Sequence, residues 1–301
     1  MGDGIRVAAP CKINLHLGIF DRRSDGFHPL ESIFQTLSFG DILWIDSLKK
    51  RSGIELQMDG FVPPEQNIVY KAVRLFQDER GDDTGWFIRL DKRIPLGSGL
   101  GGGSSDAATV LLVLNELTGN VLSRTVLEAL GAKLGSDVPF FMRGGTSYVT
   151  GRGEQIGAVS IDTPWAVVLV NSGIHSSTPE AFSLLDTFRQ EQPPKSRLLL
   201  GKEELVRILG KHPKEWTFYN DFLEVFLERG SSEIQGTYRR IFDDLKENEA
   251  DFTGLSGSGS TCFGVFSDLQ RAKIAVKTLI TRWPFVELTF PLARRGNTVV
   301  Q

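Results

Sequence analysis

One stretch of the chain reads Pro95-Leu-Gly-Ser-Gly-Leu-Gly-Gly-Gly-Ser-Ser-Asp106-Ala-Ala and carries five glycines within seven positions. An apolar run typical of a strand (86–90) precedes it, and one typical of a helix (107–117) follows it. Dense glycines let backbone N–H groups surround an anion, because no Cβ blocks the approach and positive φ is allowed. The helix that follows adds free N–H groups and a positive dipole end. The stretch therefore predicts a phosphate-binding loop. A flexible linker, the alternative, is disfavoured by Pro95, by two serines able to cap a helix, and by the apolar helix itself.

The type of phosphate loop follows by comparison with known patterns. Gly97, Gly99 and Gly102 satisfy the dinucleotide pattern G-x-G-x-x-G. That pattern requires a strand after the helix with an acidic residue about 20 positions on, whereas the next segment, 123–134, has helical periodicity. A Walker A loop needs a lysine that this loop lacks, and the H-R-D and D-F-G strings of protein kinases do not occur. The pattern indicates a third type of glycine-rich phosphate loop.

The loop resembles the second signature of the superfamily of galactokinase, homoserine kinase, mevalonate kinase and phosphomevalonate kinase. The superfamily's first signature resembles Ala9-Pro10-Cys11-Lys12-Ile13-Asn14-Leu15, and its third resembles Gly254-Leu-Ser-Gly-Ser-Gly259. Three motifs in this order, across nearly the whole chain, are a much stronger signal than any one alone. The resemblance implies a two-lobed α+β kinase fold. We expect residues 1–160 to form an ATP-binding lobe with the glycine-rich loop, and residues 161–301 to form a substrate lobe.

Three further motifs narrow the resemblance: Arg23-Ser-Asp-Gly-Phe-His28-Pro-Leu, Gly135-Ser-Asp137-Val-Pro-Phe-Phe and Gly144-Gly-Thr-Ser-Tyr-Val-Thr-Gly-Arg-Gly-Glu154. They resemble the 4-diphosphocytidyl-2-C-methyl-D-erythritol kinase family. The resemblance implies ATP-dependent phosphorylation of the 2-hydroxyl of that cytidine-diphosphate-linked polyol, in the non-mevalonate isoprenoid pathway. It covers about residues 8 to 266 and is weakest over 193–249. A sibling alcohol kinase of the mevalonate or homoserine type and a non-catalytic nucleotide-binding module are the alternatives.

Composition limits the partners. The 301 residues carry a net charge of −3, with 41% hydrophobic and 24% charged residues, which is typical of a soluble globular protein. This balance gives no general attraction to nucleic acid or to an anionic membrane, so we expect a small-molecule substrate held by local groups. No apolar run approaches the roughly 20 residues of a membrane span, and the N-terminus lacks a signal-peptide core. Cys11 and Cys262 lie far apart without a C-x-x-C pattern, which favours a reducing cytoplasm.

Apolar periodicity predicts the remaining elements. Strands are expected at 5–17, 30–37, 144–149, 165–170 and 286–290, and helices at 67–79, 123–134, 202–209, 234–248 and 271–282. Residues 250–266 are expected to form a strand, a glycine turn and a second strand, and a loop is expected at Pro193-Pro-Lys-Ser. Because strands and helices do not alternate strictly, the pattern indicates α+β. The family resemblance implies that two lobes meet over the active site, with a boundary near residues 155–165.

Two charged residues are candidates for the chemistry. Phosphoryl transfer requires positioning and neutralisation of charge, and the acceptor hydroxyl needs a group that takes its proton. Asp137 precedes an apolar run, and the residues alone leave a general base and a helix or turn cap equally open. Lys12 lies in an apolar strand, where an unpaired ammonium is costly, so a carboxylate or phosphate partner is expected, with a structural ion pair as the alternative. The resemblance implies that Lys12 polarises the hydroxyl and Asp137 accepts its proton.

The resemblance also implies an acceptor-binding set. His28 would hydrogen-bond the cytosine ring, Phe27 and Phe182 would sandwich it, and Asn14 would contact the polyol or the diphosphate. Phe27 stands where the family more often has tyrosine, which keeps stacking but removes a hydroxyl. A solvent-exposed or core histidine is the alternative for His28, and core packing is the alternative for Phe182.

For ATP, the resemblance implies that the whole loop wraps the phosphates, namely Pro95, Leu96, Gly97, Ser98, Gly99, Leu100, Gly101, Gly102, Gly103, Ser104 and Ser105. Asn67 and Lys71 resemble the family's adenine-side segment, with a helix cap and a solvated lysine as the alternatives. The turn 254–259 would help to shape the acceptor site, unless it is a plain hairpin loop. Mg²⁺ must accompany ATP, but no cluster in the sequence fixes its protein ligands.

Overall fold

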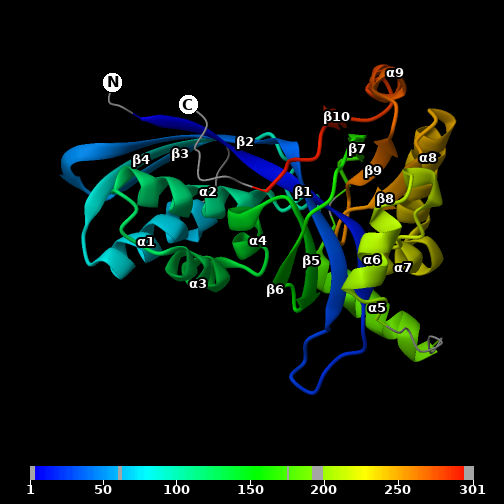
Figure 1. Cartoon of the computed structure of the whole chain (residues 1–301), viewed down its shortest axis with the longest axis horizontal. Helices are drawn as coiled ribbons and strands as arrows, with labels where there is room; N and C mark the ends of the chain where they lie inside the picture. Colours follow the sequence, from blue (N-terminus) through cyan, green and yellow to red (C-terminus); the bar gives the residue numbers. More distant parts are fainter. Residues whose placement is uncertain (1–3, 60–62, 175, 192–198, 295–301) are drawn as a thin grey trace.

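The computed structural model describes residues 4–59, 63–174, 176–191 and 199–294, and these form two sheets with helices packed on them (Figure 1). The larger sheet holds β1 (Ile5–Ile19), β2 (Leu30–Ser52), β3 (Ile54–Met58), β4 (Thr84–Asp91), β5 (Thr146–Gly151) and β6 (Gln155–Val159). Its order is β3-β4-β2-β5-β6, with β1 paired to β2. The smaller sheet holds β7 (Ala166–Asn171), β8 (Phe252–Leu255), β9 (Cys262–Phe266) and β10 (Phe285–Thr289), in the order β10-β7-β9-β8.

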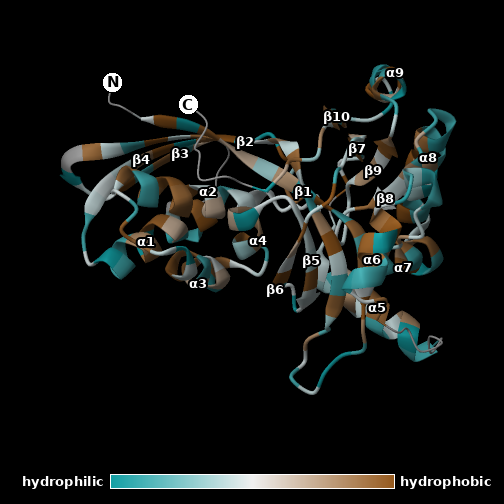
Figure 2. Ribbon diagram, viewed as in Figure 1, coloured by the Kyte–Doolittle hydropathy of each residue, from teal (hydrophilic) through white to brown (hydrophobic). Residues whose placement is uncertain are grey.

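The helices gather in two groups. The group beside the larger sheet contains α1 (Ile68–Arg80), α2 (Gly102–Leu117), α3 (Arg124–Leu134) and α4 (Val138–Arg143) (Figure 1). The later helices are α5 (Thr178–Glu191), α6 (Lys202–Leu209), α7 (Asp221–Arg229), α8 (Ser232–Glu247) and α9 (Leu269–Leu279). Figure 2 shows apolar residues along the central strands and hydrophilic ones on outer faces of α6 and α8. This mixture of helices and largely antiparallel sheet confirms the α+β class.

Strand β1 links the hydrophobic cores. Val7 and Ala9 belong to the core of the larger sheet and its helices. Ile13 lies in a central cluster with Cys11, and Ile19 lies in the core of the smaller sheet and its helices. Since one strand contributes to all three clusters, its backbone is fixed over most of its length by apolar burial. Every residue from Ala9 to Ile19 is buried.

Most predicted elements are confirmed within a few residues, and the differences have local causes. The predicted strand 30–37 continues as β2 to Ser52, although Ser38-Phe-Gly-Asp41 interrupts its apolar alternation. The predicted helix 107–117 begins five residues earlier, as α2, because its first turn is glycine and serine without apolar periodicity. Strands β3 and β6 and helices α4, α5 and α7 were not predicted. The loop predicted at 193–196 lies outside the described residues.

None of the helices in the described part of the chain combines the length and the hydropathy that a bilayer crossing requires. The division of the chain at residue 160 into an ATP-binding and a substrate lobe stays a prediction.

Candidate active site

The glycine-rich loop has a backbone that only glycine adopts easily. Gly97, Gly99 and Gly101 have φ of 63°, 75° and 72°, in the left-handed region. A Cβ at Gly99 would collide with the backbone oxygen of Ser256, and one at Gly101 would lie 2.8 Å from the Phe141 ring. Both conformation and packing therefore require glycine here.

The N-terminus of α2 is open toward the loop. Its N-cap residue is Gly101, which offers no side-chain hydrogen bond to the first turn. The expectation that serines cap this helix is wrong, because Ser104 and Ser105 lie inside the first turn, and the Ser105 hydroxyl donates to Pro10 O at 2.6 Å. The first N–H groups of a helix have no intrahelical partner, so this end offers donors and a positive dipole to an anion.

Three hydrogen bonds to backbone oxygens of the loop hold it between the two sheets. The Lys12 N–H in β1 donates to Leu100 O at 3.0 Å. On the other side, the Thr261 N–H donates to Ser98 O at 3.1 Å, and the Ser256 hydroxyl donates to Gly99 O at 2.9 Å. The turn between β8 and β9 therefore does more than close a hairpin, because it supports the loop directly.

Lys12 and Asp137 come together beside this loop. The Lys12 ammonium lies 3.8 Å from Asp137 Oδ2, donates to Asn14 Oδ1 at 2.5 Å, and sits 4.8 Å from the Phe34 ring centre. The Lys12 side chain is 5% exposed and that of Asp137 is 27% exposed. Burial lowers the pKa of Lys12, and the Asp137 carboxylate acts against that shift. The carboxylate partner that the sequence predicted for Lys12 is present.

Asp137 is held at a helix start without capping it. It is the N-cap residue of α4, but its side chain makes no capping hydrogen bond. Gly153 lies next to the Asp137 carboxylate, since a Cβ at Gly153 would be 3.9 Å from Asp137 Oδ1. The sequence left two roles open for Asp137, a general base and a helix or turn cap. The Asp137 side chain does not cap α4. The carboxylate faces Lys12 and is partly exposed.

The three sequence motifs meet at one place. A Cβ at Gly101 would lie 3.3 Å from Lys12 Cγ, which joins the first motif to the second. A Cβ at Gly257 would lie 3.6 Å from Asn14 Oδ1 and 3.4 Å from Gly99 O, which joins the third motif to both. Segments separated by more than 150 residues thus build one site.

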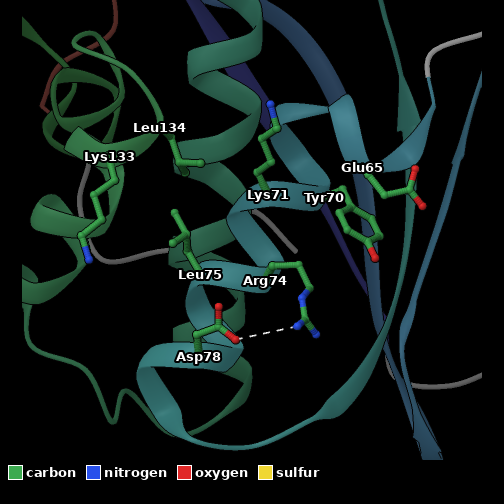
Figure 3. A pocket seen from close by; sticks show the side chains of 8 residues that line it. All are labelled: Glu65, Tyr70, Lys71, Arg74, Leu75, Asp78, Lys133 and Leu134. Carbon is green, nitrogen blue, oxygen red and sulfur yellow. Dashed lines mark ion pairs between the residues drawn. The ribbon is translucent and has the colours of Figure 1, made fainter.

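The predicted adenine-side residues are on α1. Asn67 caps that helix, because its side-chain oxygen accepts a hydrogen bond from the Val69 N–H at 2.8 Å. The helix cap, which was the alternative for Asn67, is therefore present. Lys71 is exposed and lines an open cavity of about 400 Å³ with Tyr70, Arg74 and Lys133, among others (Figure 3). An adenine contact by Asn67 or Lys71 stays a prediction.

His28 and Phe182 are brought together in the predicted base-binding region. Their rings stack with centroids 5.2 Å apart and planes 21° apart. Phe182 also packs edge-on against Phe222. Phe182 therefore takes part in core packing, which was the alternative to base binding. Phe27 is 51% exposed, and its recorded ring contact is with the Arg152 guanidinium at 4.6 Å. A sandwich of the base between Phe27 and Phe182 stays a prediction.

An ionic cluster that no sequence motif indicated lies beside the loop. The Lys92 ammonium donates to Asp106 Oδ2 at 2.8 Å and also to Asp41. Asp41 is fully buried, and its other oxygen accepts the N–H groups of Arg93 at 2.6 Å and Ile94 at 2.8 Å. The cluster therefore ties the segment that enters the loop to the first turns of α2. These three charged residues come from distant segments, so no local pattern could reveal their pairing.

Burial and ion pairing act in opposite directions on the pKa values of this cluster. Burial raises the pKa of Asp106 to about 8, although Lys92 opposes the shift. For Lys92, burial disfavours the ammonium, but the carboxylates of Asp106 and Asp41 outweigh it and raise its pKa. Among the described residues, the Asp106 Oδ1 atom is buried and has no hydrogen-bond partner. A charged carboxylate with an unpartnered buried oxygen is unfavourable, which agrees with the raised pKa of Asp106.

Comparison with known proteins places the fold and the site in one class. Residues 67–145 match the GHMP kinases N terminal domain, and residues 219–284 match GHMP kinases C terminal. A solved structure of 4-(cytidine 5'-diphospho)-2C-methyl-D-erythritol kinase superposes with a TM-score of 0.81 at 29% identity, covering 97% of this chain and 100% of that one. The fold is thus that of a GHMP kinase, a class that uses ATP as phosphoryl donor.

Curated relatives narrow the class. A 4-diphosphocytidyl-2-C-methyl-D-erythritol kinase of Xanthomonas axonopodis pv. citri is 35% identical over 90% of this chain and 85% of its own length. One of Chlorobium phaeovibrioides is 35% identical over 95% of this chain and 96% of its own length. The chain belongs to the 4-diphosphocytidyl-2-C-methyl-D-erythritol kinase family. The family resemblance inferred from the motifs is confirmed.

The ionic cluster predicts a pH-dependent difference in stability for Asp106→Asn. Because the folded pKa of Asp106 lies above the ordinary value of 3.8, unfolding releases its proton between about pH 4 and pH 8. The stability contributed by neutral Asp106 is therefore present at acid pH and lost as the pH rises toward 8. Asparagine does not titrate, so the free energy of unfolding of the variant should rise relative to wild type over that interval. Urea titrations across the interval measure it, with exposed Asp162→Asn as control. A constant difference between wild type and Asp106→Asn would contradict the assignment.

The loop geometry predicts that Gly101→Val weakens ATP binding. The new side chain would adopt a left-handed φ and press on Phe141 and Lys12. Strain of this kind costs about 1–3 kcal/mol, or roughly 5- to 150-fold in affinity if it is relieved by displacing the loop. Calorimetric titration with ATP measures the loss. Gly236→Val in α8 is the control, since a Cβ there meets nothing within 4 Å. Unchanged ATP affinity in a folded Gly101→Val protein would show that the loop does not cradle phosphate.

Proposed function

We propose that this kinase transfers the terminal phosphoryl group of ATP to the 2-hydroxyl of 4-diphosphocytidyl-2-C-methyl-D-erythritol, with ADP as the second product. The observation that carries the proposal is the buried Lys12 ammonium, 3.8 Å from the partly exposed Asp137 carboxylate, beside an uncapped helix N-terminus and its glycine loop. The printed names of the relatives supply the acceptor. The reaction belongs to the non-mevalonate route to isoprenoid precursors.

In the proposed mechanism the chain's own groups move one proton and hold two substrates. The acceptor oxygen attacks the terminal phosphorus of ATP, the bond from that phosphorus to the ADP oxygen breaks, and the hydroxyl proton passes to the Asp137 carboxylate. The Lys12 ammonium orients the hydroxyl and stabilises negative charge on the transferred group. Asn14 accepts a hydrogen bond from Lys12 at 2.5 Å, which fixes the direction of the ammonium.

The ATP phosphates would lie against the loop and the first turn of α2, whose free N–H groups supply donors. Within the described residues, no group of three His, Cys, Asp or Glu side chains could hold a metal ion alone. Mg²⁺ in such sites is usually held by substrate phosphates, waters and one or two carboxylates, so we expect it to enter with ATP. Bound in that way it neutralises phosphate charge.

The cytidine end of the acceptor would lie at the aromatic region of His28, Phe182 and Phe27, away from the reacting hydroxyl. Rings offer stacking faces, and contacts remote from the reacting atoms can support catalysis by fixing the acceptor in place. A sibling kinase for a smaller alcohol would have no use for this region. A non-catalytic module would have no need of a buried lysine paired with a carboxylate.

We also propose that the enzyme works in the cytoplasm. Both cysteines, Cys11 and Cys262, are buried free thiols. Burial raises the pKa of each thiol well above its usual range, so neither is a reactive thiolate. Unpaired cysteines of this kind are typical of a reducing compartment.

Asp137→Asn tests the proposed base. The substitution keeps the shape of the side chain but removes its ability to take a proton, so kcat should fall on the order of 10²–10⁴-fold. ATP affinity should stay near that of wild type, because the phosphates bind to the loop. Coupled ADP-release assays and ATP titration measure the two quantities, with Asp162→Asn as the matched control. Turnover near that of wild type in a folded Asp137→Asn protein would remove Asp137 from this role.

The acceptor is tested by comparing 2-C-methyl-D-erythritol with its cytidine-diphosphate form. We expect kcat/KM to be far higher for the cytidine form, because the base region adds binding energy remote from the reacting hydroxyl. His28→Ala should lower kcat/KM for the cytidine form by roughly 5- to 150-fold, the equivalent of about 1–3 kcal/mol for lost polar contacts. The KM for ATP should not change. Equal efficiency on the two acceptors would mean that the base is not recognised.

A further inference from the structure

The pairing of β1 with β2 is irregular directly after Asn14. Asn14 is paired with Phe34. His16, two residues on, is paired with Ile33, so two steps along β1 match one step along β2. An extra residue of this kind is a β-bulge, a feature that re-aims the side chains near it. Beside the bulge, the Asn14 amide donates a hydrogen bond from Nδ2 to Ser32 Oγ of β2 at 3.1 Å.

The Ser32 hydroxyl has one hydrogen, and that hydrogen is already engaged. Ser32 donates it to the backbone oxygen of His16. Toward Asn14 the Ser32 oxygen can therefore only accept, so the end of the amide that faces it must be the NH₂ group. The other end, Oδ1, then faces the Lys12 ammonium, which donates to it at 2.5 Å. Ser32 and Lys12 thus impose the same orientation on the Asn14 amide from its two sides.

Burial makes this orientation matter. Lys12, Asn14 and Ser32 are 4%, 3% and 0% exposed, so bulk water does not readily replace a lost partner. A reversed amide would point its NH₂ group at the ammonium, which has only donors, and its oxygen at a hydroxyl that is already donating elsewhere. Both contacts would leave buried polar groups unpaired, which is costly. The direction of the Lys12 ammonium therefore depends on Ser32 through Asn14.

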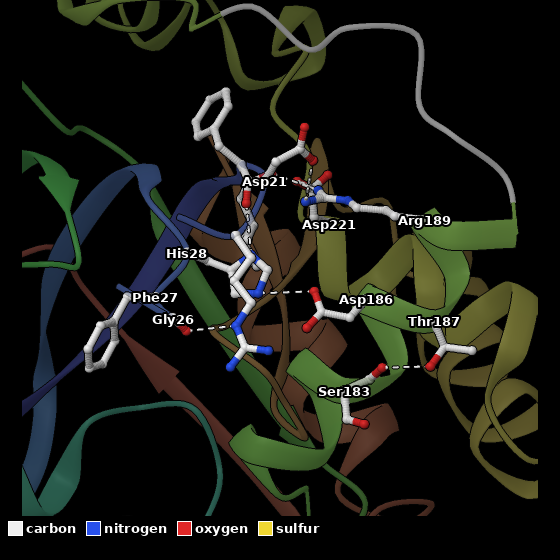
Figure 4. A network of polar contacts seen from close by, with 12 residues as sticks. Asp21, Gly26, Phe27, His28, Ser183, Asp186, Thr187, Arg189 and Asp221 are labelled. Atoms are coloured by element: carbon white, nitrogen blue, oxygen red, sulfur yellow. Dashed lines mark hydrogen bonds and ion pairs between the residues drawn. The ribbon is translucent and has the colours of Figure 1, made fainter. Parts of the chain in front are cut away.

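The end of β1 is anchored independently of Ser32. The Ile19 N–H donates to Asp221 Oδ2 at 2.7 Å, and the Ile19 oxygen accepts from the Arg189 guanidinium at 2.6 Å. Figure 4 shows Arg189 beside Asp221, with 3.0 Å between Nη2 and Oδ2. Because these contacts hold the strand, removing the Ser32 hydroxyl should act on the Asn14 amide and leave the path of β1 unchanged.

We propose that Ser32 is a positioning residue for phosphoryl transfer: it fixes the Asn14 amide, which directs the Lys12 ammonium at the acceptor hydroxyl. The proposal rests on the proposed function, since it assumes that Lys12 orients this hydroxyl. Ser32 acts through Asn14 and is not itself a catalytic residue. Its effect should appear in kcat, because a misdirected ammonium disturbs the reacting geometry and leaves the loop that is proposed to bind ATP unchanged.

The test measures kcat and the Kd for ATP in Ser32→Ala, alone and combined with Asn14→Ala. Ser32→Ala should lower kcat roughly 5- to 150-fold, the loss expected when a buried polar group loses its partner, with the Kd for ATP unchanged. In the Asn14→Ala background the same change should cost little more, because the amide through which Ser32 acts is absent. Ser32→Thr keeps the hydroxyl and should restore most of the turnover. Ser38→Ala is the matched control, since this serine of the same strand contacts Thr289 instead.

Two results would overturn the proposal. One is an unchanged kcat in a folded Ser32→Ala protein. The other is an equal loss of kcat with and without Asn14, which would mean that Ser32 only stabilises the fold. Ser32→Cys, which keeps the volume but is a weak hydrogen-bond partner, replaces Ser32→Ala if that variant folds poorly. Failure of the proposed function is a different observation, namely that wild type does not phosphorylate the cytidine form, and the same comparison then applies to the alcohol that it does accept.

Discussion

The burial of β1 along almost its whole length is the constraint on which the rest of the structure depends. The strand contributes side chains to all three hydrophobic clusters, so its backbone cannot shift without disturbing each of them. Lys12 and Asn14 lie near the middle of this strand. The candidate chemistry therefore rests on the most firmly packed part of the molecule, and the parts that contact it are positioned relative to β1.

The loop is the second element fixed in this way. Its backbone accepts hydrogen bonds from β1 on one side and from the turn after β8 on the other. Such close approach leaves no room for a side chain at Gly99 or Gly101. The dense glycines thus serve packing as well as the proposed anion binding. Asp41, which accepts the N–H groups of Arg93 and Ile94, fixes the segment through which the chain enters the loop.

Local patterns made the loop and β1 predictable, because glycine density and a lysine within an apolar strand are visible in a short window. The pairing of Lys12 with Asp137 was implied only by the family resemblance, since the two residues lie far apart in the chain. The serine cap was wrong because the helix starts on glycine, which carries no apolar periodicity. Pairings such as Lys92 with Asp41, or His28 with Asp186, could not be predicted. Each joins residues far apart in the chain, and a lone charged residue looks the same whether it is solvated or paired.

The charges of the site also explain why the backbone must bind the phosphates. Lys12 is balanced by Asp137, and Lys92 is paired with the Asp41 carboxylate and with Asp106, so these cations add no net positive charge to a site that is proposed to bind two polyanions. The groups proposed to attract phosphate are therefore the open N-terminus of α2, the N–H groups of the loop and the Mg²⁺ that is proposed to enter with ATP. These groups carry no side-chain proton, so their contribution does not change with pH as that of a titrating side chain would. A helix start without a cap is therefore a requirement of the site, and glycine at position 101 is how the sequence meets it.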